Sequence, residues 1–195
     1  IGSGIIVVFP AHMNKILELD PKTGSVALQP GLNYGKLQQT LQTHGRFLPP
    51  YPASIEYSTL GGAIGNNASG EKTVKYGCTR DFIKGLRVVL ANGEVVETRR
   101  LNKRELSKKM GLSSMEGEIY RALDKIIEDN KELVLQTKLN VSKNSAGYDI
   151  ADVKQKDGSF DLTPLIVGAQ GTLGIVTEAV IDTEAYNPAT TLIVA

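Results

Sequence analysis

A segment poor in bulky side chains, residues 58–70, carries the clearest chemical signal in the sequence. It reads Ser-Thr-Leu-Gly-Gly-Ala-Ile-Gly-Asn-Asn-Ala-Ser-Gly, so four of its thirteen residues are glycine. Because glycine lacks a Cβ and tolerates positive φ, such a segment lets main-chain N–H groups approach an anion closely. A helix beginning near Thr59 would add its first unpaired N–H groups and the positive end of its dipole. This chemistry suits a phosphorylated cofactor that lies along the chain.

The same composition also suits a tight turn or a close contact between a helix and a sheet, and composition alone leaves both interpretations open. The segment is not a Walker loop, because no Gly-Lys-Ser/Thr follows it. It is not the GxGxxG fingerprint of dinucleotide-binding proteins either, because its glycines are spaced differently and no hydrophobic strand precedes it.

None of the other chemically reactive side chains in the sequence can be assigned a catalytic role. His12 and His44 stand alone in the sequence, and surface or capping roles are favoured for both. Cys78 is the single cysteine, which excludes an internal disulfide and indicates a reducing compartment; we expect it to be a small buried thiol. The acidic residues show no pairing typical of acid–base catalysis, and no metal-ligand spacing is present. The catalytic residues therefore stay unknown, and no metal site is predicted.

The overall composition is that of an ordinary globular chain with one large or two small domains. The 195 residues are 41% hydrophobic and 22% charged, which allows a substantial core. A net charge of +1 argues against a nucleic-acid partner. No apolar run approaches the roughly 20 residues that a transmembrane helix needs, and no signal peptide is visible. We expect a cytoplasmic protein, with peripheral attachment to the inner membrane face left open. Because the sequence lacks an initiator Met, we interpret it as a piece of a longer protein.

The expected elements mix strand hairpins with helices. Asn33 is expected to cap a helix that ends at His44-Gly45, and Asn92-Gly93 is a strong hairpin signal. The full set is a strand at 5–9, a hairpin of 15–19 with 25–29, an extended segment at 46–52, a polar loop at 71–80, a hairpin of 85–91 with 94–98, helices at 103–110 and 118–130, an uncertain polar stretch at 140–159, and a strand at 175–181. Because regular βαβ alternation is missing, this pattern indicates an α+β fold.

Four separated blocks of the sequence together resemble one known family. They are residues 48–54 (Leu-Pro-Pro-Tyr-Pro-Ala-Ser), 58–70 followed by 74–81, 85–93, and 167–178. In order and spacing they resemble the PCMH-type FAD-binding domain of vanillyl-alcohol-oxidase-like flavoproteins. The most similar branch holds the glycolate oxidase catalytic subunit and the FAD-linked D-lactate and D-2-hydroxyglutarate dehydrogenases. The resemblance covers nearly the whole chain. It implies an antiparallel or mixed sheet flanked by helices, with residues 1–32 a remnant of the first FAD-binding subdomain and 33–195 the second subdomain.

The resemblance implies FAD as the cofactor and ten residues beside it. Thr59, Gly61 and Gly62 would supply backbone N–H groups and close approach along the pyrophosphate and ribityl chain. Pro52 would lie near the flavin, and Ile175 and Val176 near the adenine. The full set is Pro52, Ser58, Thr59, Gly61, Gly62, Asn66, Asn67, Gly70, Ile175 and Val176. Tyr148 also lies in a block similar to the family's, so a place at the flavin pocket and a place at the edge of the core are both open.

The implied activity is oxidation of a D-2-hydroxy acid, such as D-lactate or glycolate, to the 2-oxo acid. Gln170 replaces a glutamate that is usual in the family, and Tyr51 replaces a common aspartate. The family's first phosphate loop would precede residue 1. Its substrate-cap domain would follow residue 195, so we expect the fragment to be inactive alone and its substrate to be bound by that missing domain.

Two other functions stay open at this point. One is a non-catalytic FAD-binding or interaction subunit of a glycolate oxidase-like complex, and the other is an unrelated nucleotide-binding module. The particular hydroxy acid and the redox acceptor are not predicted, and a homo-oligomer is left open.

Overall fold

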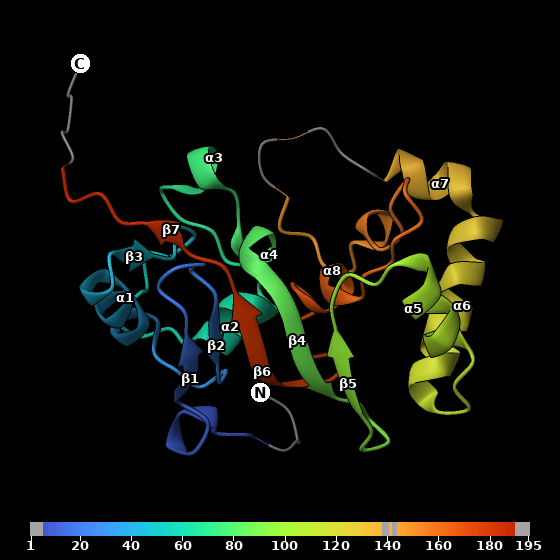
Figure 1. Cartoon of the computed structure of the whole chain (residues 1–195), viewed down its shortest axis with the longest axis horizontal. Coiled ribbons are helices and arrows are strands. Elements are labelled where there is room, and N and C mark those ends of the chain that lie inside the picture. Colours follow the sequence, from blue (N-terminus) through green and yellow to red (C-terminus); the bar gives the residue numbers. More distant parts are fainter. Residues whose placement is uncertain (1–5, 138–140, 142–143, 190–195) are drawn as a thin grey trace.

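The structure of the chain, a computed structural model, describes residues 6–137, 141 and 144–189. Its centre is a five-stranded sheet with the strand order β1-β2-β6-β4-β5, in which every neighbouring pair is antiparallel (Figure 1). These strands are β1 (Ile16–Leu19), β2 (Val26–Leu28), β4 (Ile83–Val89), β5 (Val95–Thr98) and β6 (Ile175–Ile181). Two short strands, β3 (Arg46–Phe47) and β7 (Glu184–Ala185), form a separate pair.

Helices flank the sheet, with α5, α6 and α7 lying beyond the β5 edge and α1 beyond the β1 edge (Figure 1). The α-helices are α1 (Tyr34–Thr43), α2 (Leu60–Gly65), α3 (Thr73–Tyr76), α4 (Thr79–Phe82), α5 (Lys103–Met110), α6 (Met115–Asp129), α7 (Lys131–Gln136) and α8 (Thr163–Ile166). Two 3-10 helices, η1 (Phe9–Ala11) and η2 (Ile150–Asp152), complete the set in the described ranges.

Strand β6 holds the two halves of the sheet together. Its C-terminal half pairs with β2, where Val26 lies opposite Ile181. Its whole length pairs with β4, from Val89 opposite Ile175 to Ile83 opposite Ile181. Because the first residues of β6 pair with β4, the point at which β6 begins is fixed relative to that strand.

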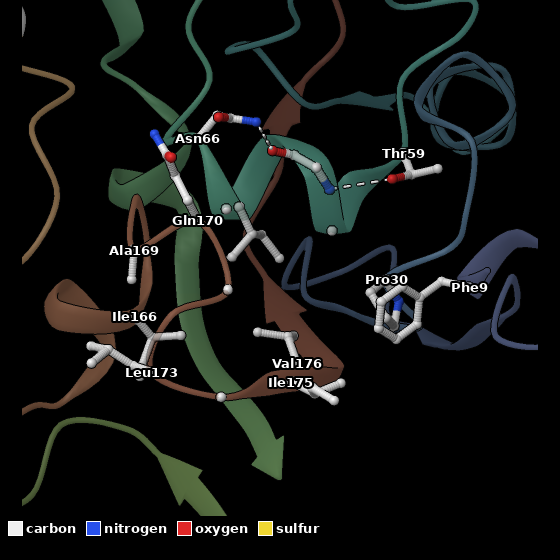
Figure 2. Close-up of a pocket in the computed structure, with 16 residues that line it drawn as sticks. Phe9, Pro30, Thr59, Asn66, Ile166, Ala169, Gln170, Leu173, Ile175 and Val176 are labelled. Atoms are coloured by element: carbon white, nitrogen blue, oxygen red, sulfur yellow. Dashed lines mark hydrogen bonds between the residues drawn. The ribbon is translucent and has the colours of Figure 1, made fainter. Parts of the chain in front are cut away.

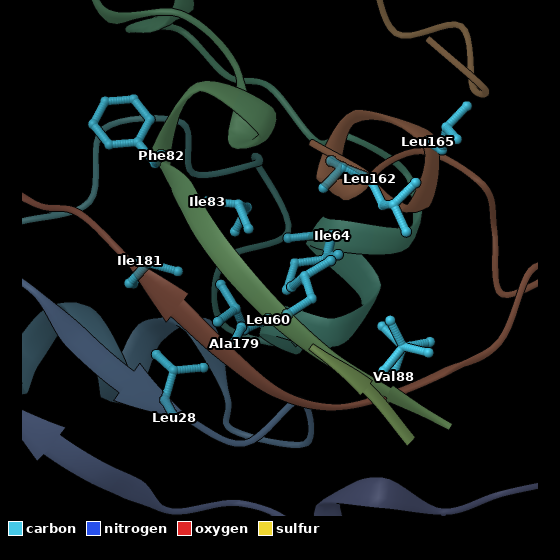
Figure 3. Packing of buried hydrophobic residues seen from close by; sticks show 14 of the residues in the cluster. Leu28, Leu60, Ile64, Phe82, Ile83, Val88, Leu162, Leu165, Ala179 and Ile181 are labelled. Carbon is cyan, nitrogen blue, oxygen red and sulfur yellow. The ribbon is translucent and has the colours of Figure 1, made fainter. Parts of the chain in front are cut away.

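Helix α2 packs one face on the sheet and turns glycines away from it. Leu60, Ala63 and Ile64 are buried and share a face, as residues at positions i, i+3 and i+4 do. Figure 3 shows Leu60 and Ile64 beside Ala179 of β6 and the ribbon of β4. Gly62 and Gly65 do not belong to the buried set of α2. The helix therefore presents its backbone, rather than side chains, on the face away from the core.

Most of the expected elements are confirmed. The two hairpins form as β1–β2 and β4–β5, and β6 covers the range expected for it. The Asn33 side chain accepts a hydrogen bond from the Lys36 N–H at 3.0 Å, so Asn33 caps α1 as expected, and His44 is the C-cap of α1. The α+β class is also confirmed, and the sheet is wholly antiparallel.

Two expectations are wrong. Residues 6–8 form no strand, and Ile6 is 75% exposed, because no neighbouring strand pairs with them within the described residues. The polar stretch 71–80 is not a loop throughout, since it contains α3 and the start of α4. The proposed division after residue 32 stays a prediction; the central sheet runs across it.

Ile181 tests the role of β6 in stability. Its side chain is 0% exposed, so Ile181→Ala is expected to lower the free energy of unfolding by about 2–5 kcal/mol through lost burial and a residual cavity. The neighbouring Val180 points to the other face and is 37% exposed, so Val180→Ala is expected to cost about 1 kcal/mol or less. Urea unfolding of both variants measures the difference. Equal losses of unfolding free energy in the two variants would contradict the placement of Ile181 in the core.

Candidate cofactor site

A pocket of about 440 Å³ opens beside the glycine face of α2. Figure 2 shows α2 on one side of it and the start of β6, with Ile175 and Val176, on another. Phe9 and Pro30 lie at one end, while Ile166 and Leu173 lie at the other (Figure 2). The lining residues are Phe9, Pro30, Thr59, Gly61, Gly62, Ile64, Gly65, Asn66, Ile166, Ala169, Gln170, Gly171, Leu173, Gly174, Ile175 and Val176.

The N-terminus of α2 is fixed by hydrogen bonds to a preceding loop. The Leu60 N–H donates to the Leu32 carbonyl at 2.9 Å, and the Gly61 N–H donates to the Pro30 carbonyl at 2.7 Å. Thr59 is the N-cap, and its Oγ1 accepts from the Gly62 N–H at 3.2 Å. The first turn of α2 is therefore satisfied within the protein.

The loop that leads into β6 is bound to the C-terminal end of α2. The Gly168 N–H donates to the Ile64 carbonyl, and the Gln170 N–H donates to the Gly65 carbonyl, both at 2.9 Å. At the far end of the loop, a Cβ on Gly174 would lie 2.6 Å from a Val88 side-chain atom. A side chain at Gly174 would therefore push the loop off β4, so this glycine keeps the pocket wall close to the sheet.

The glycines around the pocket fall into two groups. A Cβ on Gly61 would lie 2.7 Å from a Pro30 side-chain atom, so Gly61 is required by packing. A Cβ on Gly62 would meet only Thr59 Oγ1 at 3.5 Å, and one on Gly65 only the Gln170 Cα at 3.8 Å. A Cβ on Gly171 would meet nothing within 4 Å. Gly62, Gly65 and Gly171 thus border open space that a side chain would fill, and we call these three the open glycines.

The pocket is electrically neutral, because none of its lining residues carries an ionisable side chain. The Gly171 and Leu173 N–H groups donate to no acceptor in the described part of the chain. The Gln170 side-chain amide likewise makes no hydrogen bond to the residues that the structure describes. The pocket can therefore offer neutral donors to a ligand, together with apolar surface from Ile175 and Val176.

The structure brings six of the ten predicted site residues together in this pocket: Thr59, Gly61, Gly62, Asn66, Ile175 and Val176. The other four do not line it: Pro52, Ser58, Asn67 and Gly70. Asn67 is 0% exposed, and its Oδ1 accepts from the Arg80 N–H at 2.9 Å. A Cβ on Gly70 would lie 1.8 Å from the Tyr51 carbonyl oxygen, so Gly70 serves close packing of two loops. The Ser58 hydroxyl is buried without a partner among the described residues.

The predicted donor role of the α2 amides is wrong for Gly61 and Gly62. Their N–H groups are used by Pro30 and Thr59, so they are not free to bind an anion. What these positions provide is close approach of the backbone. The second glycine-rich stretch, residues 168–174, contributes open donors instead, a role that the sequence analysis missed although its glycine content was visible.

The remaining candidate groups lie outside the pocket lining. The Cys78 Sγ lies 3.4 Å from the Asp81 carboxylate, and burial together with that charge raises the pKa of the thiol above its usual value. Cys78 therefore stays protonated at neutral pH. The His44 Nδ1 lies 2.9 Å from the Thr40 carbonyl, which fits the predicted capping role. Over the described residues, no cluster of three or more His, Cys, Asp or Glu side chains is arranged to hold a metal ion.

Within those same ranges, no helix combines the length and the apolar character that crossing a bilayer requires.

The chain is similar in sequence and in fold to known proteins. It is 34% identical over 184 residues to a D-2-hydroxyglutarate dehydrogenase of Escherichia coli (strain K12), an alignment that covers 93% of this chain and 18% of the relative. It is 33% identical over 178 residues to glycolate oxidase subunit GlcD of Bacillus subtilis (strain 168), covering 91% of this chain and 27% of that protein. The structure resembles alkyldihydroxyacetonephosphate synthase with a TM-score of 0.56 and 25% identity, over 91% of this chain and 24% of that one.

The chain thus spans between about a fifth and about a quarter of the length of these proteins. Residues 1–99, about half of the chain, match the family described as the FAD binding domain. This match includes the first glycine-rich segment and all of α2. The chain belongs to the FAD binding domain family.

Proposed function

We propose that this chain is the FAD-binding portion of a flavin-dependent oxidoreductase that oxidises a D-2-hydroxy acid to the 2-oxo acid. The observation that carries the proposal is the wall of open glycines beside a neutral pocket. Relatives named as D-2-hydroxyglutarate dehydrogenase, glycolate oxidase subunit and D-lactate dehydrogenase support the substrate class. Because the chain spans only part of each, the activity belongs to the whole protein.

The pocket fits a bulky phosphorylated cofactor for a steric reason. Gly62, Gly65 and Gly171 leave room that even a methyl group would occupy, although the surrounding protein does not need that room for its own packing. A pyrophosphate can lie there against the backbone and accept hydrogen bonds from the Gly171 and Leu173 N–H groups. These contacts stabilise negative charge without a cationic side chain.

The apolar end of the pocket suits the adenine ring. Ile175 and Val176 begin β6, and Phe9 lies at the same end of the pocket (Figure 2). Their side chains offer a surface on which a flat heterocycle can pack. Pro52, Ser58, Asn67 and Gly70 stay proposals for contacts with the rest of FAD, the first of them near the flavin.

In the proposed reaction, FAD supplies the group that accepts two electrons from the substrate. The residues of this chain bind FAD, orient it and exclude water from its pyrophosphate. The pocket lining holds no acid or base, so the group that takes the substrate's hydroxyl proton is not among these lining residues. We assign the hydroxy acid site to the part of the protein that the relatives have beyond this segment. A cytoplasmic location and a homo-oligomer remain proposals.

The uncharged lining also supports a second candidate, a non-catalytic FAD-binding or interaction subunit of a glycolate oxidase-like complex. Such a subunit needs a cofactor wall but no acid–base group of its own. Substrate turnover by the whole protein separates the two candidates.

Gly62→Val tests the pocket directly. The valine side chain would occupy the open space, so FAD binding is expected to weaken by about 10- to 100-fold. This corresponds to a loss of about 1.4 to 2.8 kcal/mol of binding free energy. The free energy of unfolding should change by no more than about 1 kcal/mol, since an added Cβ meets only Thr59 Oγ1. Flavin fluorescence titration and urea unfolding measure the two effects.

Gly111→Ala is the matched control for that variant. Gly111 follows α5 with φ of −75°, and an added Cβ there would make only ordinary contact with the Lys108 carbonyl at 3.4 Å. FAD affinity should stay unchanged. If Gly62→Val bound FAD as tightly as the parent, the open glycines would not line the cofactor path.

A substrate test addresses the activity of the whole protein. Anaerobic addition of D-2-hydroxyglutarate, D-lactate or glycolate to the flavin-loaded full-length protein is expected to bleach the visible flavin band. The L-enantiomers of the two chiral acids should leave the band intact. Bleaching by dithionite but by none of the hydroxy acids would support the accessory subunit instead.

A further inference from the structure

Three non-glycine residues of the described chain have positive φ, and they lie in three segments that meet beside the pocket. They are Asn67 at 45°, Tyr148 at 57° and Gln170 at 53°. A side chain in this region costs on the order of 1 kcal/mol, so such conformations persist where the surroundings enforce them.

The three segments are in close contact. The Asn67 Nδ2 donates to the Asn144 carbonyl at 3.4 Å. A Cβ on Gly147 would lie 2.5 Å from the Gly168 carbonyl oxygen, so residues 144–149 approach the pocket loop without an intervening side chain. Because the Gln170 N–H is bonded to the end of α2, the junction joins α2, the pocket loop and residues 144–149.

Arg80 lies at the centre of this junction and binds two of the three segments. Its main-chain N–H donates to Asn67 Oδ1 at 2.9 Å. Its guanidinium donates to the Asp149 carboxylate and, through Nη2, to the Ala146 carbonyl at 3.0 Å. The side chain is only 12% exposed, so these charge-assisted bonds are shielded from solvent. The planar guanidinium can hold both partners at once, which a lysine ammonium does less well.

The segment that Arg80 holds reaches the rim of the pocket through Tyr148. The Tyr148 hydroxyl lies 2.6 Å from Thr172 Oγ1. Thr172 stands between Gly171 and Leu173, which line the pocket and whose N–H groups donate to no acceptor among the described residues. Arg80 itself does not line the pocket.

We propose that Arg80 is a positioning residue for the cofactor pocket, acting through Tyr148 and Thr172 on the N–H groups of Gly171 and Leu173. Its guanidinium fixes residues 144–149, and the Tyr148 hydroxyl then holds the pocket loop in the conformation that binds a phosphate. The identity of the ligand as FAD rests on the proposed function, but the positioning of the loop does not.

Two variants and their combination test this role. Arg80→Lys keeps the positive charge but removes the planar guanidinium that donates to two partners at once, while Tyr148→Phe removes a single hydroxyl. Each is expected to weaken FAD binding to the flavin-free full-length protein by about tenfold, the scale of one lost hydrogen bond to a charged group. The double variant should be no weaker than the worse single variant, because both changes break the same connection. Arg87→Lys, at an ion pair on the surface of β4, is the control and should bind normally.

Hydrogen exchange tests the positioning without FAD. Exchange at the Thr172 N–H, which donates to the Ala169 carbonyl at 3.1 Å, is expected to rise in both variants, while exchange in β4 and β5 stays at the parent's rate. Additive losses of FAD affinity, or unchanged exchange at the Thr172 N–H in Tyr148→Phe, would overturn the proposal. If the parent bound no FAD, the proposed function would fail, and the exchange comparison alone would then decide the role of Arg80. If Arg80→Lys did not fold, Tyr148→Phe would still decide it.

Discussion

The constraint on which the site depends is the two-faced packing of α2. Leu60, Ala63 and Ile64 bury one face on β4 and β6, and this fixes the helix at a set distance from the sheet. The opposite face then carries only hydrogen atoms at Gly62 and Gly65. A helix with ordinary side chains there would fill the pocket. The fold thus keeps a space beside a rigid backbone, which is what a large cofactor requires.

The loop between α8 and β6 completes the pocket because both of its ends are fixed. One end is bonded to the carbonyl end of α2, and the other runs into the part of β6 that pairs with β4. Between these points lie Gln170 and Gly171, with positive φ and open polar groups. In the proposed site the loop supplies the hydrogen-bond donors for an anion, while α2 supplies the shape of the pocket.

The sequence predicted those features that are encoded locally. Asn92-Gly93 specified its hairpin, and the side chains of Asn33 and Thr59 capped the helices that follow them. The site was harder to predict, because its hydrogen bonds join residues that are far apart in the sequence. No local pattern reveals that the Pro30 and Leu32 carbonyls take the first N–H groups of α2, or that Asn67 turns inward while its neighbour Asn66 lines the pocket. Residues 6–8 show the same limit of prediction from local sequence, since an apolar run forms a strand only when a neighbouring strand pairs with it.

The most direct test is to observe the backbone amides while FAD is added. In 1H–15N spectra of the chain titrated with FAD to millimolar concentration, the amide signals of Gly62, Gly65 and Gly171 are expected to shift together and to saturate. The signals of Gly93 and Gly111, which lie in a hairpin turn and after α5, should stay in place. Shifts confined to other residues, or an unchanged spectrum at saturating FAD, would contradict the account of a cofactor lying against the open glycines.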